Sequence, residues 1–258
     1  MLQNLHGLPA NAAGPAGKKE QVEMMFERAD RLLRQSGADY QQVVRTWIYL
    51  SEILYWYPEF NEVRNAKYAQ WGLMPAANEP PGTHSLRLPA STGIRGDNPL
   101  GAACVMDLLA IKSNPEGQPE ISQMTNLKQQ DAFRYHRAFS RGACVRDQEG
   151  VCVQVSGTAA IDEQGQSLFP DDARAQIVRT LENIEALLAP ANVGLKNVCS
   201  ATVFLKRPED AAIYHRVAAE RGLSELPAVY MIADVCRPEL LFEMDAIVAS
   251  PYSSERTS

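Results

Sequence analysis

An internal repeat constrains the fold of this chain more than any other feature. Residues 21–50 align without a gap with residues 176–205, at an offset of 155 residues (176 minus 21). Self-similarity at a fixed offset indicates a repeated structural unit, so two copies of one module are predicted. The matching pairs are Gln21/Gln176, Glu27/Glu182, Leu32/Leu187, Leu33/Leu188, Val43/Val198 and Leu50/Leu205, followed by Pro89-Ala90/Pro227-Ala228 and Ala110-Ile111/Ala246-Ile247.

The second copy has the clearer pattern of secondary structure. Short β-rich runs on either side of Gln148-Glu149-Gly150 predict a hairpin. Apolar residues at helical spacing after Asp172 predict a helix with an aspartate at its N-cap. The expected elements are a hairpin of residues 143–146 and 151–155, a helix with Ile177, Leu181, Ile184 and Leu188, a strand at Val198–Leu205, a helix from Pro208 to about Arg221, and strands at 229–235 and 240–249.

Strands and helices in this order predict an α+β fold. Each module is expected to be a β-α-β-α-β unit with its helices on one face of a mixed sheet. Successive side chains of a strand point to opposite faces, and in the last strand one face is wholly apolar and the other mixed. We expect the mixed face to lie at a subunit interface that contains a cleft. The two sets are Phe242, Met244, Ala246 and Val248 on the apolar face, and Leu241, Glu243, Asp245 and Ile247 on the mixed face.

The first copy is incomplete at its N-terminal end. Extended backward, the repeat places Met1 opposite Ser156, so the first module is predicted to lack the N-terminal hairpin, unless the true start lies upstream. Stretches rich in glycine, proline and small polar residues are interpreted as a leader and a linker. The predicted organisation is a disordered leader (1–17), a truncated module (18–112), a linker (113–130), a complete module (131–250) and a tail (251–258).

Charge and composition restrict the partners. A formal net charge of −6 and a pI of about 5.3 disfavour nucleic acid and anionic membrane, but not a small anionic substrate. No apolar run approaches the roughly 20 residues of a membrane span, and the first residues show no signal-peptide pattern. The five cysteines form no CxxC pair, and the four histidines have no metal-ligand spacing. We therefore expect reduced thiols, no metal or other cofactor, and a cytoplasmic location.

Several motifs occur in a characteristic order in the second copy. They are Phe139-Ser140-Arg141-Gly142, Val155-Ser156-Gly157-Thr158-Ala159, Thr180-Leu181-Glu182-Asn183-Ile184 and Thr202-Val203-Phe204-Leu205-Lys206. With these motifs, residues 138–249 resemble the Rid (reactive intermediate deaminase) superfamily. With its tandem arrangement the chain looks most like the chorismatases, the two-module branch of that superfamily. The resemblance implies chorismate-mutase-like modules, a homo-oligomer with trimeric or pseudo-trimeric packing, and clefts between modules.

The catalytic pattern departs from that of the deaminases. The arginine with which those enzymes hold a substrate carboxylate is replaced here by Val229, and their first-strand tyrosine by Phe139. Residues 236–243 are instead similar to the end motif of chorismatases. The resemblance implies that Cys236 and Glu243 line the active site, with Glu243 as the proton donor. Residues 162–165 depart from that pattern too, because a glycine-histidine pair is expected there in chorismatases.

Glu243 also has a physical argument in its favour. An acid that shares a strand face with Leu241 and Ile247 is partly desolvated, which favours its protonated form near neutral pH. The alternative is a solvated or salt-bridged carboxylate. Cys236 has no evident base partner, so it is interpreted as an active-site wall or a buried apolar residue. The predicted substrate-binding residues are Arg216, Arg141, Arg237, Tyr135, Ser156, Gly157 and Thr158.

Three functions fit these residues. The first is a chorismatase-like enzyme that cleaves the enolpyruvyl group of chorismate by acid catalysis, which gives pyruvate and a dihydrodiol or a hydroxybenzoate. The second is a Rid-type enamine or imine deaminase, which Val229 disfavours. The third is a non-catalytic protein that binds an anionic metabolite in the same cleft. We favour the first, while the status of the chain as an enzyme stays open at this stage.

Overall fold

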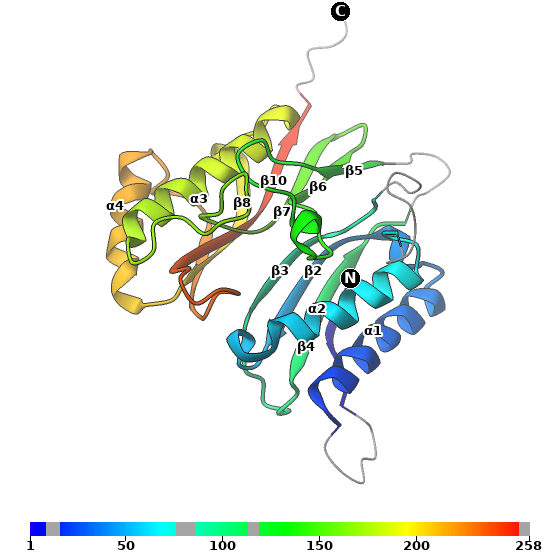
Figure 1. Cartoon of the computed structure of the whole chain (residues 1–258). Coiled ribbons are helices and arrows are strands. Elements are labelled where there is room, and N and C mark those ends of the chain that lie inside the picture. Colours follow the sequence, from blue (N-terminus) through cyan, green and yellow to red (C-terminus); the bar gives the residue numbers. More distant parts are fainter. Residues whose placement is uncertain (9–15, 76–85, 113–118, 253–258) are drawn as a thin grey trace, which may run out of the picture.

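Two mixed β-sheets, each covered by a pair of helices, make up the protein (Figure 1). A computed structural model describes residues 1–8, 16–75, 86–112 and 119–252 of the chain. The first module consists of β1 (Leu2–His6), α1 (Lys18–Gln35), β2 (Val43–Leu50), α2 (Ile53–Gln70), β3 (Ala90–Arg95) and β4 (Cys104–Ala110). The second consists of β5 (Glu120–Met124), β6 (Gly142–Arg146), β7 (Gly150–Ala159), α3 (Ala173–Leu188), β8 (Val198–Leu205), α4 (Ala211–Glu220), β9 (Ala228–Ile232) and β10 (Phe242–Pro251).

The predicted tandem α+β arrangement is confirmed. The first sheet has the strand order β1-β4-β2-β3 and the second β5-β6-β7-β10-β8-β9. In each sheet one pair, β2-β3 or β8-β9, is parallel and the other pairs are antiparallel. Corresponding strands pair in the same way in both sheets, because Ile48 lies opposite Met106 just as Val203 lies opposite Met244. The predicted pair Ala110/Ala246 is wrong by two residues, because Thr46 lies opposite Leu108 where its repeat partner Ala201 lies opposite Ala246.

Local sequence explains the helices of the second module. The Asp172 carboxylate accepts a hydrogen bond from the Ala175 backbone N–H, as expected of an N-cap, and α3 follows directly. The α3 stripe predicted from the sequence is buried, and Phe242 and Met244 of β10 pack against it. A 3₁₀ turn that begins at Pro208 leads into α4, and Gly222, with φ of +68°, follows its end.

Two predictions about the ends of the first module are corrected. Residues 1–17 are not a disordered leader throughout, because residues 2–6 form β1, which pairs with β4; residues 9–15 lie outside the described part. Strand β1 takes the place that β7 has in the second sheet, and both contain a register shift at the matching position. In the described part of the first sheet β6 has no counterpart, so the predicted lack of a hairpin holds for one of its two strands.

The predicted linker, residues 113–130, also contains structure. Residues 120–124 form β5, which pairs antiparallel with β6 and extends the second sheet. Residues 113–118 lie outside the described part of the chain. Strand β5 escaped detection because its burial alternates only weakly and its residues are mostly polar, as is usual for an edge strand.

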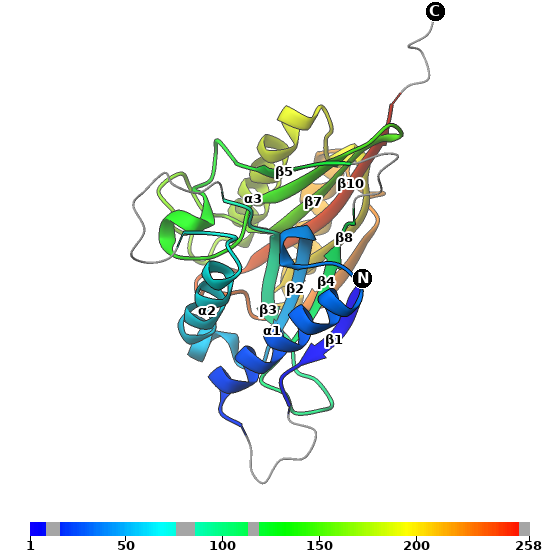
Figure 2. The same cartoon turned by 90° about the vertical axis from the view of Figure 1, so that its right-hand side faces the viewer.

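The mixed face of the second sheet is covered by the first sheet of the same chain, not by another subunit. Strand β3 lies along β7 (Figures 1 and 2), and the Ser140 N–H donates to the Pro89 carbonyl at 3.0 Å. Between the sheets, Arg45 and Asp245 form a buried ion pair with 2.8 Å between Nη2 and Oδ2. One apolar cluster around Ile94 and another around Ala90 flank this pair.

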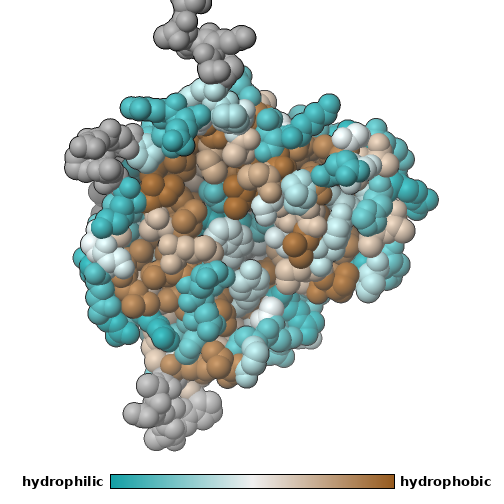
Figure 3. All heavy atoms as spheres, turned by 180° about the vertical axis from the view of Figure 1, so that it is seen from behind, coloured by the Kyte–Doolittle hydropathy of each residue, from teal (hydrophilic) through white to brown (hydrophobic). Residues whose placement is uncertain are grey.

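The face of the molecule that points away from the viewer in Figure 1 carries apolar side chains at its surface (Figure 3). On the edge strand β9, Val229 and Ile232 are 65% and 55% exposed. The predicted homo-oligomer with trimeric or pseudo-trimeric packing stays a prediction. Within the described ranges, no helix combines the length and the apolar character that crossing a membrane requires.

The buried ion pair gives a stability prediction. Arg45→Met leaves the Asp245 carboxylate buried without a counter-charge, so we expect the free energy of unfolding to fall by about 3–5 kcal/mol, with part of the loss recovered in Arg45→Met/Asp245→Leu. Urea unfolding measures both. The exposed pair between Arg34 and Asp30 provides the control, because Arg34→Met removes a helix-surface contact worth about 0.3–0.5 kcal/mol. Equal losses in Arg45→Met and Arg34→Met would contradict this account.

Candidate active site

A pocket opens where α2 of the first module meets the second sheet. It contains about 450 Å³ of empty space, part of which is open to solvent. Its lining combines one carboxyl group with three guanidinium groups and several aromatic rings. The lining residues are Tyr57, Tyr135, Arg137, Phe139, Arg141, Gly157, Ala159, Ile161, Cys236, Arg237 and Glu243.

Glu243 supplies the carboxyl group of the pocket. It lies on β10 between Ala159 of β7 and Phe204 of β8, and only 4% of it is exposed. Burial, and then the neighbouring charge of Asp245, raise the pKa of Glu243 to about 8. Among the described residues no group forms a hydrogen bond with its side chain. Glu243 therefore carries a proton at neutral pH and can donate it to a bound molecule.

Gly157 makes room for that carboxyl group. It lies at the β7 register shift, and a Cβ added there would be 2.1 Å from Glu243 Oε1, far inside van der Waals contact. The carboxyl group thus rests directly on the Gly157 backbone. A side chain at this position would force Glu243 to move, so Gly157, which the sequence predicts as a substrate-binding residue, shapes the site through its missing side chain.

Three arginines provide positive charge at the pocket without a carboxylate partner among the described residues. Arg141 donates through Nε to the Gln130 carbonyl at 2.9 Å and through Nη2 to the Tyr135 hydroxyl. Arg137 lies over the Tyr57 ring, with 5.4 Å between Cζ and the ring centroid. Arg237 is the third. Their guanidinium groups can bind carboxylates in the bidentate geometry that such anions prefer.

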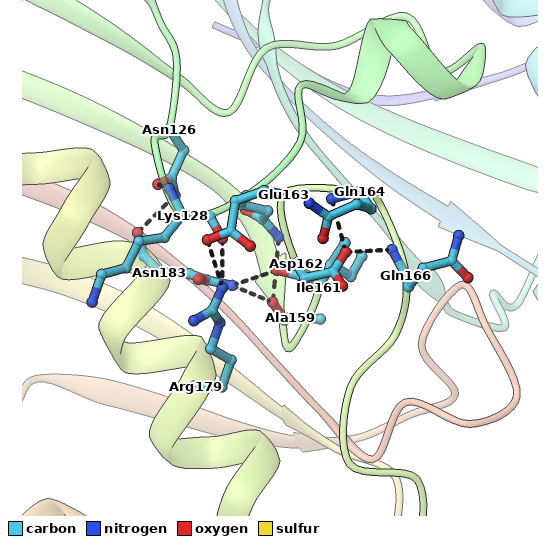
Figure 4. A network of polar contacts seen from close by, with 11 residues as sticks. Asn126, Lys128, Ala159, Ile161, Asp162, Glu163, Gln164, Gln166, Arg179 and Asn183 are labelled. Atoms are coloured by element: carbon cyan, nitrogen blue, oxygen red, sulfur yellow. Dashed lines mark hydrogen bonds and ion pairs between the residues drawn. The ribbon is translucent and has the colours of Figure 1, made fainter.

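Arg237 is held by the loop that follows β7. Its Nη1 donates to the Gly165 carbonyl at 2.9 Å and to Ser167 Oγ at 3.1 Å. Polar contacts fix this loop against α3 (Figure 4). There Asn183 donates to the Ala159 and Ile161 carbonyls, and Arg179 Nη2 lies 3.4 Å from Glu163 Oε1. The residues that replace the expected glycine-histidine pair therefore support a pocket arginine.

Cys236 is a wall of the pocket with a protonated thiol. Burial, and then the charge of Glu243, raise the pKa of the Cys236 thiol to about 12. The thiolate is the nucleophilic form, so a protonated Cys236 is unsuited to covalent catalysis. The residues that the structure describes contain no cluster of three or more histidine, cysteine, aspartate or glutamate side chains suited to a metal ion.

The pocket brings together six of the nine site residues that the sequence predicts. These are Glu243, Cys236, Arg141, Arg237, Tyr135 and Gly157.

The other three lie elsewhere. Arg216 is an exposed residue of α4, on the helix-covered side of the sheet and outside the pocket lining. Ser156 is buried and connects the sheets, because its Oγ accepts from the Ser91 N–H and donates to the Ser140 carbonyl. Thr158 pairs with Met244, and its hydroxyl donates to the Ser156 carbonyl.

Sequence reasoning missed two polar groups of the pocket. Tyr57 lies in an aromatic run with Tyr55 and Trp56, and composition alone does not separate its members, since Tyr55 is 83% exposed. Arg137 stands two residues before Phe139 in one extended segment, and this spacing was the available signal. Tyr57 gave no local signal, because α2 approaches the second sheet only after folding.

The raised pKa of Glu243 predicts a pH-dependent stability. The folded-state pKa of about 8 exceeds the unfolded value of 4.5, so the folded protein binds the extra proton and loses stability as pH rises from about 4.5 to about 8. The change is about 1.4 kcal/mol per unit within that window. Urea unfolding at pH 5 and pH 9 should therefore show that the free energy of unfolding falls less between these two pH values in Glu243→Gln than in wild type. Glu209→Gln, which changes an exposed glutamate, serves as control. An equal fall of the free energy of unfolding in all three proteins would refute the prediction.

Comparisons with known proteins agree with this architecture. A family model described as endoribonuclease L-PSP matches residues 130–250. The chain is 28% identical over 178 residues to 3-hydroxybenzoate synthase of Streptomyces hygroscopicus, which covers 63% of this chain; the chain spans about half (51%) of that relative. It is 32% identical over 96 residues, 37% of this chain, to 3-aminoacrylate deaminase RutC of Acinetobacter baylyi, with 76% of that relative covered.

A solved structure shares both sheets. The crystal structure of a chorismatase superposes with a TM-score of 0.71 at 23% identity, over 88% of this chain and 69% of the chorismatase chain. This likeness extends through both modules, whereas the family model matches the second. The chain therefore belongs to the Rid/YjgF (endoribonuclease L-PSP) superfamily, and its two-sheet fold is similar to that of a chorismatase.

Proposed function

We propose that this protein cleaves the enolpyruvyl group of chorismate, releasing pyruvate by acid catalysis without a covalent enzyme intermediate. The observation that carries this proposal is a buried Glu243, protonated at neutral pH, in a pocket with Arg137, Arg141 and Arg237. The similarity to 3-hydroxybenzoate synthase and the chorismatase-like fold support the same reaction class.

Recognition of the substrate rests on the arginines. Chorismate carries two carboxylates, and guanidinium groups without a carboxylate partner suit both. Tyr135 and Tyr57 add hydroxyl groups and apolar ring faces beside the guanidinium groups. The pocket can thus bind both the ring carboxylate and the enolpyruvyl carboxylate of chorismate. The enolpyruvyl methylene group would then lie near Glu243.

The chemistry needs one proton from the protein. Glu243 protonates the enolpyruvyl methylene carbon, and the ether carbon becomes an oxocarbenium centre. If water attacks that centre, the resulting hemiketal collapses to pyruvate and a dihydrodiol. If a hydroxybenzoate forms instead, chorismate divides into pyruvate and the benzoate with no net water. In either case Glu243 is left as a carboxylate and takes a proton back before the next turnover.

Deamination of enamines or imines is the alternative. The 3-aminoacrylate deaminase match favours it, and the family model spans every residue of the pocket lining except Tyr57. Against it stands Val229, at the position where deaminases carry a carboxylate-binding arginine. Val229 is 65% exposed and does not line the pocket. The arginines of the pocket would have to replace that contact.

A coupled pyruvate assay with chorismate tests the proposal directly. Wild type should release pyruvate, and Glu243→Gln should lower kcat by about 10²–10⁴, the usual contribution of a general acid. Glu209→Gln, which changes an exposed glutamate, should match wild type. Ammonia release from 2-aminoacrylate without pyruvate from chorismate would favour the deaminase. A ligand-induced rise in melting temperature that survives Glu243→Gln, with neither activity, would favour a binding protein.

Gly157 provides a second test through shape alone. In Gly157→Ala the new methyl group collides with the Glu243 carboxyl group, so we expect kcat to fall at least about tenfold while the protein stays folded. The control is Gly194→Ala, because a Cβ at Gly194 meets no atom within 4 Å. Unchanged kcat in Gly157→Ala would mean that the carboxyl group does not act from this position.

A further inference from the structure

A polar network crosses the sheet–sheet interface directly behind the pocket. Thr92 Oγ1 accepts a hydrogen bond from Arg45 Nη2 at 2.5 Å and donates to Asp245 Oδ2 at 2.7 Å. The same oxygen accepts from the Gly157 N–H at 3.1 Å. Arg45 and Thr92 belong to the first sheet, whereas Asp245 and Gly157 belong to the second. One hydroxyl therefore joins the two modules at the glycine on which Glu243 rests.

The network holds the Asp245 side chain in place. Its Oδ2 accepts hydrogen bonds from the Arg45 guanidinium and from the Thr92 hydroxyl, and only 4% of the residue is exposed. Asp245 stands two residues from Glu243 on the same face of β10, so its fixed negative charge disfavours a second one on Glu243.

The network also fixes where the Glu243 carboxyl group lies. The Thr92 hydroxyl holds the Gly157 amide at the β7 register shift, and the Thr92 methyl group would be 3.2 Å from a Cβ at Gly157. Glu243 Oε1 is packed onto the same spot. A displacement of this backbone moves the surface that supports the acid.

We propose that Arg45 and Thr92 of the first module are positioning residues for the Glu243 carboxyl group of the second module, on which they act through Asp245 and the Gly157 backbone. This inference rests on the function proposed for Glu243. Neither residue lines the pocket, so their effect on the reaction is indirect. The charged or titratable groups that face Glu243 are Asp245 on β10, Arg45 on β2, Tyr57 on α2, Arg137 and Arg141 before β6, and Cys236 and Arg237 before β10.

The pH profile of kcat tests this inference, because a residue with a purely structural role would leave the profile unchanged. In wild type, kcat should fall as pH rises through about 8, where Glu243 loses its proton. Asp245→Asn keeps an acceptor for Arg45 and removes the repelling charge, so this alkaline limb should move down by about one pH unit or more. An alkaline limb at the wild-type pH in Asp245→Asn would overturn the inference.

Variants of Thr92 test whether this residue positions the Glu243 carboxyl group. Thr92→Val removes the hydroxyl at constant shape and should lower kcat about tenfold with little change in KM, whereas Thr92→Ser should restore most of it. The matched control is Thr46→Val, a buried threonine of β2 whose hydroxyl bonds Ser91 and does not reach Asp245. Equal kcat in Thr92→Val and Thr46→Val would refute the role of Thr92.

A measurement without substrate separates this inference from the proposed function. The side-chain carboxyl ¹³C resonance of Glu243, identified by its loss in Glu243→Gln, can be titrated by NMR in wild type and in Asp245→Asn. A lower midpoint in Asp245→Asn supports the network even if no pyruvate is formed, in which case only the proposed function fails. An identical midpoint in both proteins refutes the network, whatever the outcome of the pyruvate assay.

Discussion

The buried pair of Arg45 and Asp245 is the interaction on which the rest of the structure depends. Each charge alone would carry a desolvation penalty of several kcal/mol between two sheets, so the first sheet can dock only where the pair forms. Apolar clusters on either side of the pair exclude water and strengthen the attraction. The pocket lining takes Tyr57 from the first module and the rest from the second, so docking of the modules also assembles the pocket.

The alternation of side chains along β10 connects the core with the chemistry. Phe242 and Met244 point toward α3 and α4 and fill the core of the second module, which fixes the strand. The alternate residues of the strand, Glu243 and Asp245, are thereby turned toward the first sheet and away from water. Asp245 forms its ion pair with Arg45 there, whereas Glu243 has no such partner in the described structure and keeps its proton. Two carboxyl groups on one strand face thus lie in different electrostatic surroundings.

Long periodic segments were predictable from sequence, and short edge segments were not. The α3 helix and strand β8 carry complete patterns of helical or β-branched residues, and the structure has them with the expected bounds or nearly so. Strands β1 and β5 have five residues each and largely polar surfaces, and Asn4 in β1 has a φ of +55°. Their pairing with β4 and β6 supplies the hydrogen bonds that make them strands, and this information lies outside the segments themselves.

By itself, the sequence determined the tandem modules, the helix-covered face of each sheet and the desolvation of Glu243, because repeats, periodicity and a carboxylate among aliphatic residues are local properties. Only the tertiary structure decided what faces Glu243. Tyr57 and Arg45 come from the first module, about 200 residues away along the chain, and no local pattern marks them. It also placed Arg216 outside the pocket, since α4 covers the other face of the sheet. The charge state of an acid depends on the groups that surround it in space, so only the folded structure gives Glu243 the surroundings that raise its pKa.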